Sequence, residues 1–466
     1  MQSKSGSERI DVLTSAQLRA THVSRLRLGT VTDAKLVMGF FVFLLVLSAL
    51  DAYDIGRLPV QWIMQLASIA GIGFIAVRQK LFNPLGYRIL WLVLFWSALV
   101  TGFSTVFGHY ASLMPAGATT PYPLFIALRL LTLLFFIASL YLIYWLVRQG
   151  YRDPLVKATV LVATLVSIAA LYIYFAQIYG WPQPPRTRLG TSGAAQVSNF
   201  TYEFRRATGT FREPSLLAAW LIVPFFLCFA IRGRFAYAQA ILIGGTLLLT
   251  GSLSGILAVT LGLVVTAVTA FWYGARSLRT VARALGAGLG VAVSALAIFY
   301  LLAVSNTNHR VNLFATIGDR IGPILKGGLG QSDRNHVYDY VVHTIPPLFG
   351  AGLGNANLLL GQFMGTPVVA GFLSLYLNIL YSVGLVGLAI LMWFVVFPLY
   401  KIATNRDLRR DSRVLLMVGA YLAWLVVFAV AIEELTFMFA LISALLAYAI
   451  FNRSKSAASA REAVRR

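Results

Sequence analysis

Residues 207–220 read ATGTFREPSLLAAW and mark the point where a polar segment becomes an apolar helix. Pro214 suits the first turn of a helix, where its missing N–H costs nothing. Glu213 comes just before that turn, at the positive end of the helix dipole, which favours a carboxylate. The stretch therefore predicts an apolar helix from about residue 215, with the charged pair Arg212 and Glu213 at its entrance.

The composition of the whole chain is that of a membrane protein. Of its 466 residues 59% are hydrophobic and 12% are charged, and the mean hydropathy is +0.77. Soluble domains are usually about 45–50% apolar and about 25% charged. The net charge of +22 is spread between apolar runs instead of forming one patch, which argues against nucleic acid as a partner. The single cysteine, Cys228, excludes a disulfide framework and a cysteine-based metal site.

Apolar runs predict the number of membrane spans. A helix needs roughly 20 apolar residues to cross the hydrocarbon. By this criterion we expect an all-α polytopic protein with about 12 transmembrane helices. Their predicted starts are near Ala34, Pro59, Tyr87, Pro123, Leu155, Ser215, Phe235, Leu253, Leu285, Val368, Ser412 and Leu435.

Lysine and arginine set the expected orientation, because they are enriched in cytoplasmic loops. The orientation that places most lysines and arginines in cytoplasmic segments has both termini in the cytoplasm. The expected parts are a cytoplasmic N-terminal tail (1–33), helices 1–5 (34–179), an outer loop (180–214), helices 6–9 (215–304), a large outer loop (305–367), helices 10–12 (368–451) and a cytoplasmic tail (452–466).

The two long outer loops run against the usual charge bias. They hold every basic residue of the predicted outer segments except Arg57. Long loops in compact proteins are usually functional or disordered. These loops are therefore expected to bind something negative.

The first outer loop contains three arginines close together in sequence. Arg205, Arg206 and Arg212 could form an anion clamp suited to phosphate. Glu213 beside them could act as a general base or hold an arginine in place. In the alternative interpretation, Arg212 and Glu213 simply cap a helix at the membrane interface.

The second outer loop predicts a short helix between Ser332 and Pro346. His336, Asp339 and His343 recur at spacings of three and four, so they share one face of it. One interpretation is an amphipathic helix on the membrane surface; another is a metal site of two histidines and one aspartate. Near the helix N-terminus, which favours anions, Arg334 is a candidate phosphate ligand.

Two further features have competing explanations. Residues 350–355, GAGLGN, do not form a GxGxxG motif after a strand, so we expect a glycine turn and no nucleotide site. Arg129 lies inside a predicted span. It could snorkel to the interface or contact a lipid-linked anion in a lateral groove. No GxxxxGK[ST], HExxH or CxxC motif is present, and no cofactor or metal is expected.

Three stretches resemble the O-antigen polymerase and ligase superfamily, which comprises Wzy-type polysaccharide polymerases and WaaL-type ligases. They are TGTFREPSLLA (208–218), LLLTGSLSGILAVTLGLVV (247–265) and SDRNHVYDYVVHTIPPLFGAGLGN (332–355), the last followed by LYLNILYSVGLVGLAI (375–390).

The resemblance implies a GT-C-like glycosyltransferase in the bacterial inner membrane, with its active site facing the periplasm. Its donor would be a glycan on undecaprenyl pyrophosphate, and a chain-length regulator is an expected protein partner. Arg212 and Arg334 match the family's functional arginines, and Glu213 matches the glutamate of polymerase-like sequences. The expected substrate contacts, taken together, are Arg129, Arg205, Arg206, Arg212, Arg320, Arg334 and Tyr338.

The sequence departs from the family in two places. Ligases have a histidine–asparagine pair where this chain has Leu373 and Ser374, which favours a polymerase and leaves a ligase as the alternative. The general base stays open among Glu213, Asp333, His336 and Asp339. Leu253 stands where many relatives have arginine. A flippase or transporter ranks lower, because such proteins often place charges inside broken helices and only Arg129 lies within a predicted span.

Overall fold

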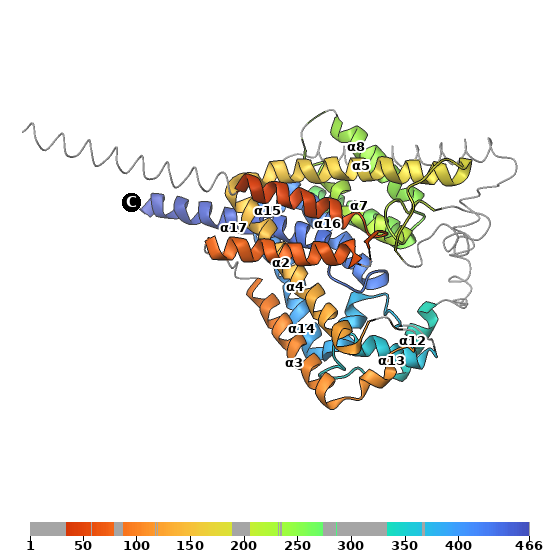
Figure 1. The fold of residues 1–466 in the computed structure, drawn as a ribbon. Coiled ribbons are helices and arrows are strands. Elements are labelled where there is room, and N and C mark those ends of the chain that lie inside the picture. The colour runs from red at the N-terminus through yellow and green to blue at the C-terminus, as the bar shows by residue number, and fades with distance from the viewer. Residues whose placement is uncertain are drawn as a thin grey trace, which may run out of the picture.

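The computed structural model describes residues 34–56, 58–78, 87–116, 118, 120–188, 206–231, 233, 235–273, 286, 333–365 and 369–465. The side chains of Arg78, Ile178, Asp333, Arg334 and residues 452–465 are not among those described. This part of the chain is helical almost throughout (Figure 1).

The elements follow one another in chain order. They are a helix Ala34–Ser48, β1 (Asp54–Ile55), β2 (Leu58–Pro59), α2 (Val60–Arg78), α3 (Arg88–Phe107), η2 (Tyr110–Leu113), α4 (Tyr122–Leu146), η3 (Val147–Tyr151), α5 (Arg152–Tyr179), α7 (Pro214–Cys228), α8 (Phe235–Leu249), α9 (Leu253–Trp272), α12 (Asp333–His343), α13 (Asn355–Phe363), α14 (Leu375–Thr404), α15 (Arg406–Arg409), α16 (Ser412–Val430) and α17 (Phe437–Arg465). The two short strands form an antiparallel hairpin in which Asp54 pairs with Pro59 and Ile55 with Leu58.

Most predicted helix starts lie within three residues of an observed start. The start near Val368 is wrong, because α14 begins at Leu375. Residues 369–373 are apolar but not helical: the carbonyl oxygen of Ala370 and the N–H of Phe372 bond to side chains from other segments. The predicted start near Leu285 falls outside the described residues.

Several helices have the length and composition of membrane spans. In the described part of the chain six helical stretches qualify: Val60–Val77, Arg88–Phe107, Tyr122–Gln177, Leu253–Trp272, Leu375–Thr404 and Ser412–Val430. The longest of them contains both α4 and α5, and the chain turns sharply between these at Gly150, where φ is 90°. Four shorter apolar helices accompany them: Ala34–Ser48, Pro214–Cys228, Phe235–Leu249 and Phe437–Phe451. The chain is therefore a helical protein of the membrane type.

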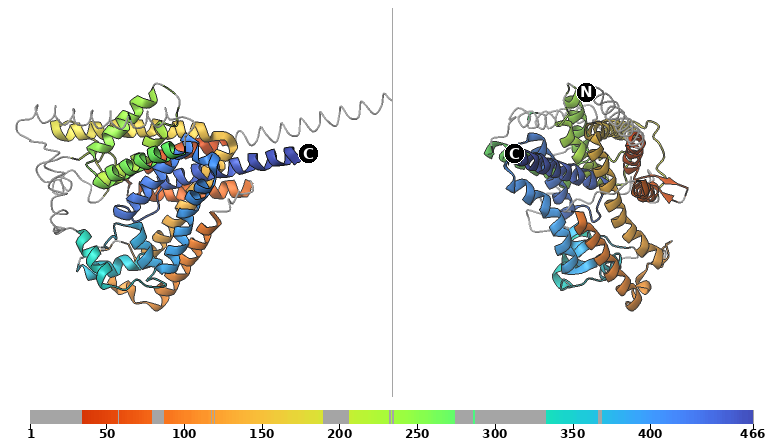
Figure 2. Two further views of the ribbon diagram at one scale, coloured as in Figure 1. Left: turned by 180° about the vertical axis from the view of Figure 1, so that it is seen from behind. Right: turned by 90° about the vertical axis from the view of Figure 1, so that its left-hand side faces the viewer.

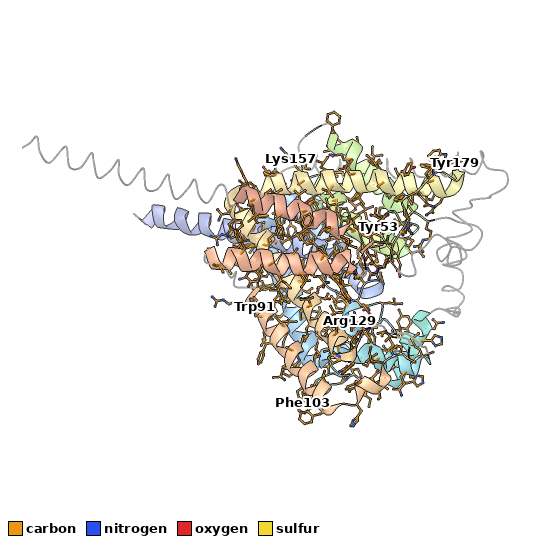
Figure 3. The ribbon with its side chains drawn as sticks, viewed as in Figure 1. Tyr53, Trp91, Phe103, Arg129, Lys157 and Tyr179 are labelled. Atoms are coloured by element: carbon orange, nitrogen blue, oxygen red, sulfur yellow. The ribbon has the colours of Figure 1, made fainter. Side chains whose placement is uncertain are left out.

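The core lies around α4, α7, α16 and α17. Almost every side chain of α7 is buried, as expected for a helix that is apolar all round. On α3, in contrast, Trp91, Phe95 and Phe103 are exposed, which suits contact with hydrocarbon. Trp91 and Phe103 are labelled in Figure 3. Helices α9 and α16 approach closely because both carry glycine at the contact. A Cβ on Gly262 would lie 2.5 Å from the carbonyl oxygen of Gly419, so small residues are required there.

Two views show how the ends of the molecule are arranged. The C-terminal end of α17 lies at one end of the bundle, and α12 and the end of α5 lie at the other (Figures 1 and 2). Helices α4 and α14 run from the main layer of helices toward the region that holds α3, α12 and α13.

Helix α14 is interrupted at Gly384, where φ is 77° and ψ is −179°. At this break the glycine-rich segment 347–352 completes the backbone hydrogen bonding. The N–H of Leu385 donates to the carbonyl oxygen of Pro347 (3.1 Å), and the N–H groups of Ala351 and Gly352 donate to the carbonyls of Tyr381 and Ser382 (2.9 and 2.7 Å). The prediction that GAGLGN forms a compact turn is confirmed, and the turn docks on a broken helix.

Candidate functional site

Asp51 lies just after the first described helix and holds two arginines. Its Oδ2 accepts hydrogen bonds from Nε of Arg212 (2.9 Å) and from the backbone N–H of Arg212 (3.2 Å). Nη1 of Arg188 donates to its Oδ1 (3.2 Å) and to its carbonyl oxygen (3.0 Å). The Asp51 side chain is only 2% exposed. Such charge-assisted bonds fix the direction of both guanidinium groups.

The other arginines of this loop have different partners. Nε of Arg206 donates to the carbonyl oxygen of Thr250 at the end of α8 (2.7 Å). Arg186 donates to Oγ1 of Thr208 and to the carbonyl oxygen of Gly209. Residues 206–212 therefore extend between the α8–α9 turn and Asp51. Arg205 lies outside the described residues.

Glu213 is the residue before α7 and is exposed. Its Oε2 accepts a hydrogen bond from Oγ of Ser215 (3.1 Å). Within the described part of the chain it forms no ion pair with an arginine. Its position at the helix entrance is the one that the sequence predicts.

A pocket opens beside Asp51 and the start of α7. It contains about 640 Å³ of empty space, part of it open to the outside. Its polar lining comes from Ser48, Asp51, Gln61, Gln65, Thr132, Glu434 and Thr436, and its apolar lining from Met64, Phe135, Phe211, Leu216, Trp220, Trp424, Ile432, Leu435, Phe437 and Met438. Such a cavity suits a ligand that is apolar over most of its length and polar at one end.

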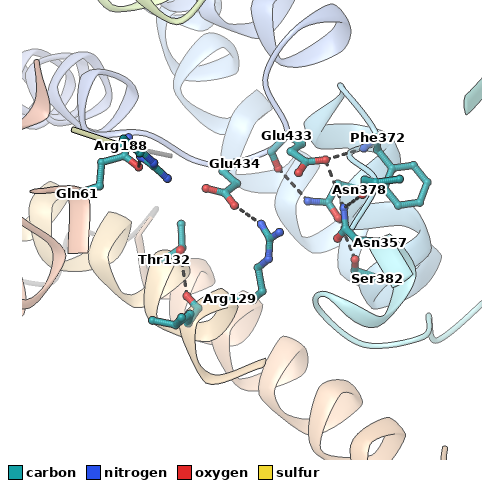
Figure 4. Close-up of polar contacts among 12 residues, drawn as sticks. Gln61, Arg129, Thr132, Arg188, Asn357, Phe372, Asn378, Ser382, Glu433 and Glu434 are labelled. Carbon is teal, nitrogen blue, oxygen red and sulfur yellow. Dashed lines mark hydrogen bonds and ion pairs between the residues drawn. The ribbon is translucent and has the colours of Figure 1, made fainter. Parts of the chain in front are cut away.

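Arg129 of α4 forms an ion pair with Glu434, which lies in the connection between α16 and α17 (Figure 4). Its guanidinium also lies 5.3 Å from the centre of the Phe125 ring. The Arg129 side chain is 24% exposed. Arg129 is therefore paired with a carboxylate from a distant part of the chain, a partner that neither sequence-based interpretation includes.

Glu433, next to Glu434, faces a different set of groups (Figure 4). Its Oε2 accepts from the backbone N–H of Phe372 (2.6 Å) and from Nδ2 of Asn357 (3.5 Å), and its carbonyl oxygen accepts from Nδ2 of Asn378 (3.0 Å). Burial raises the pKa of the Glu433 carboxyl, Arg129 lowers it and Glu434 raises it. These bonds join the α16–α17 connection to α13 and α14.

Helix α12 is amphipathic, as the sequence predicts. His336, Tyr338 and Asp339 are exposed, and Nδ1 of His343 lies 2.7 Å from the carbonyl oxygen of Asp339. The opposite face is buried: Val337 and Tyr340 pack in a small cluster with Phe372 and Tyr381, among others.

The structure does not support the metal site as an explanation of this helix. In the described ranges no group of three or more His, Cys, Asp or Glu side chains could hold a metal ion. No described side chain of α12 lines the pocket beside Asp51. Arg320, together with the side chains of Asp333 and Arg334, lies outside the described residues.

Sequence reasoning missed four residues of this region: Asp51, Arg188 as the partner of Asp51, Glu433 and Glu434. A signal was present, because the chain has only 16 acidic residues and two of them are adjacent at positions 433 and 434, before an apolar run. Intramembrane or boundary carboxylates are costly and usually functional.

A comparison of the chain with protein-family models and with curated protein sequences finds no match.

Proposed function

We propose that this protein is a polysaccharide polymerase, a glycosyltransferase that uses a glycan carried on undecaprenyl pyrophosphate. It would transfer the glycan to a hydroxyl group of another lipid-linked repeat unit. The proposal includes about twelve transmembrane helices, cytoplasmic termini, a GT-C-like architecture, and a site on the periplasmic face of a bacterial inner membrane.

The observation that carries the proposal is the juxtaposition of the pocket with the ion pairs of Asp51. An apolar cavity suits the isoprenoid part of such a donor, and arginines fixed beside it suit the diphosphate. Groups that are already oriented can stabilise the charge that develops on the leaving diphosphate without having to reorganise.

The arginines are neutralised in part by two carboxylates, Asp51 and Glu434. This arrangement lowers the cost of holding cations in a poorly solvated region.

The test is an assay of the full-length protein in lipid nanodiscs with radiolabelled lipid-linked repeat units. The expected products are a ladder of longer glycans on the lipid carrier and free undecaprenyl pyrophosphate. Movement of the substrate across vesicle membranes without new glycosidic bonds would instead show a flippase.

Cells provide the complementary test. A strain without the protein should lose long chains and keep single lipid-linked repeats. Long chains that still form on the carrier but are not transferred to their final acceptor would show a ligase.

A further inference from the structure

The two carboxylates in the pocket lining differ in how firmly they are held. Asp51 is 2% exposed, and arginines occupy both of its side-chain oxygens. The Glu434 side chain is 42% exposed, and among the described residues its hydrogen-bond partner is Arg129. Asp51 therefore has a structural role, because both of its side-chain oxygens are occupied. Glu434 is accessible and can exchange Arg129 for another partner.

The other candidate bases of the described part lie elsewhere. Glu213, His336 and Asp339 are exposed and none of them lines the pocket. Glu433 bonds to Phe372 and Asn357 and is not in the lining either. Among the described carboxylates, Glu434 thus both lines the pocket and has an exposed ion pair, with Arg129, that a ligand can replace.

Glu434 also lies within electrostatic reach of a second guanidinium. Figure 4 draws it between Arg129 and Arg188. Burial lowers the pKa of Arg188, as does Arg212, while the negative charges of Asp51, Asp54 and Glu434 act in the opposite direction. Arg129 and Arg188 do not line the pocket themselves; they lie behind the lining carboxylates Glu434 and Asp51. A diphosphate that reaches them from the pocket would compete with Glu434 for the same cations, because phosphate oxygens and carboxylates use the same guanidinium donors.

We propose that Glu434 is the general base of the transfer reaction and that Arg129 holds it until a diphosphate takes its place. This inference rests on the proposed function. The donor diphosphate binds Arg129, and the released carboxylate of Glu434 accepts the proton of the acceptor hydroxyl.

The acceptor oxygen then forms a bond to the anomeric carbon of the donor glycan. The bond from that carbon to the diphosphate oxygen breaks, and its electron pair leaves with undecaprenyl diphosphate. Glu434 afterwards gives its proton to water and pairs again with Arg129 when the diphosphate leaves.

The experiment compares turnover with diphosphate binding in the full-length protein in nanodiscs. The probes are radiolabelled lipid-linked repeat units for turnover and undecaprenyl diphosphate for binding. Glu434→Gln should lower the rate of chain extension by about 100-fold or more, as for the loss of a general base. The variant should bind undecaprenyl diphosphate at least as tightly as the wild type, because no ion pair between Arg129 and residue 434 has to be broken before the diphosphate binds.

Two further variants complete the design. Glu434→Asp retracts the carboxylate by one methylene and should lose about tenfold in rate with undiminished binding, since it keeps a weaker base in place. Asp153→Asn makes the same kind of acid-to-amide change at an exposed position in the first turn of α5 and should keep the wild-type rate.

Three results would overturn the inference. One is a rate in Glu434→Gln within threefold of the wild type. Another is a parallel loss of rate and diphosphate binding in that variant, which indicates a structural role. The third is loss of rate in Glu213→Gln with a normal rate in Glu434→Gln. A wild-type protein that neither binds undecaprenyl diphosphate nor extends repeats would overturn the proposed function itself, together with this inference.

Discussion

Asp51 and Arg212 are 161 positions apart in the chain, and Nε of Arg212 lies 2.9 Å from Oδ2 of Asp51. This pair joins the end of the first described helix to the entrance of α7. It positions Arg212 from outside its own loop, so the loop sequence alone does not determine where the guanidinium lies.

Replacing this carboxylate should destabilise the protein. In Asp51→Asn, Arg188 and Arg212 both lose a charged acceptor in a partly buried setting, and an unsatisfied buried partner costs about 1–3 kcal/mol. We expect a loss of this size in the free energy of unfolding, measured by titration with SDS. Asp153→Asn, at an exposed site, should change it by less than about 0.5 kcal/mol. Equal stability of wild type and Asp51→Asn would contradict the role of Asp51 as the central acceptor.

Arg212 and Arg334 are predicted to be required for chain extension. Arg212→Ala should reduce the rate by about 10²–10³-fold if it stabilises the leaving diphosphate. Arg334→Ala is expected to have a similar effect under the proposed function, on the basis of the resemblance of residues 332–355 to polymerase sequences. Insertion into the membrane should be normal in both variants.

Lysine is the informative replacement at these two positions. It keeps the charge but lacks the planar fork of donors, so Arg212→Lys and Arg334→Lys should recover little activity if the contact is bidentate. Wild-type chain lengths in the two alanine variants would identify both arginines as interfacial anchors.

The break in α14 should not tolerate a side chain. At Gly384 φ is 77°, and a Cβ would lie 2.2 Å from the carbonyl oxygen of Leu348. Backbone strain of this type costs of order 1–3 kcal/mol, and the clash adds to it. Gly384→Ala should therefore lower the thermal unfolding temperature clearly.

The matched control for this substitution is Gly73→Ala in α2. No atom lies within 4 Å of a Cβ built on Gly73, and alanine is better than glycine inside a helix by roughly 0.5–1 kcal/mol. This variant should be neutral or slightly more stable than the wild type. An equal effect of the two substitutions would show that the break at Gly384 has no special constraint.

Glu433 should make stability depend on pH. Because burial raises its pKa above the ordinary value of 4.5, the folded protein binds this proton more tightly than the unfolded chain. The contribution of this carboxyl to stability is then fully present at acidic pH and is lost as the pH rises from 4.5 through the raised pKa, since the folded state holds more protons in that window.

The measurement is the unfolding free energy of wild type and Glu433→Gln between about pH 4 and pH 8, the range around the ordinary carboxyl pKa. The difference between the two unfolding free energies should vary with pH. In a plot of unfolding free energy against pH, the variant should lack the part of the slope that comes from the Glu433 carboxyl. A constant difference in unfolding free energy over the whole range would mean that Glu433 titrates in the same way in the folded and the unfolded protein.

The helices could be predicted from the sequence because each apolar run is marked locally. Pro214 marks the start of α7, and charged stretches mark the gaps between runs. The short helix α12 and the glycine turn after it were predicted for the same reason. The predicted start of α14 is too early because residues 369–373 are apolar, whereas the backbone groups of Ala370 and Phe372 are bound by Asn357 and Glu433.

The site was harder to predict because its ion pairs connect distant parts of the chain. Arg129 and Glu434 are 305 positions apart, and nothing near Arg129 in the sequence indicates an acidic partner. The expected grouping of Arg206 with Arg212 followed from their proximity in sequence. In the structure, Arg206 instead donates to the carbonyl oxygen of Thr250 and Arg212 to the carboxylate of Asp51.

The docking of residues 347–352 on α14 limits how this part of the chain can change over evolutionary time. The carbonyls of Tyr381 and Ser382 and the N–H of Leu385 have their partners in that segment. An insertion or deletion between positions 347 and 352 would shift the register and leave several peptide groups unpaired in an apolar helix. This short segment should therefore keep a fixed number of residues.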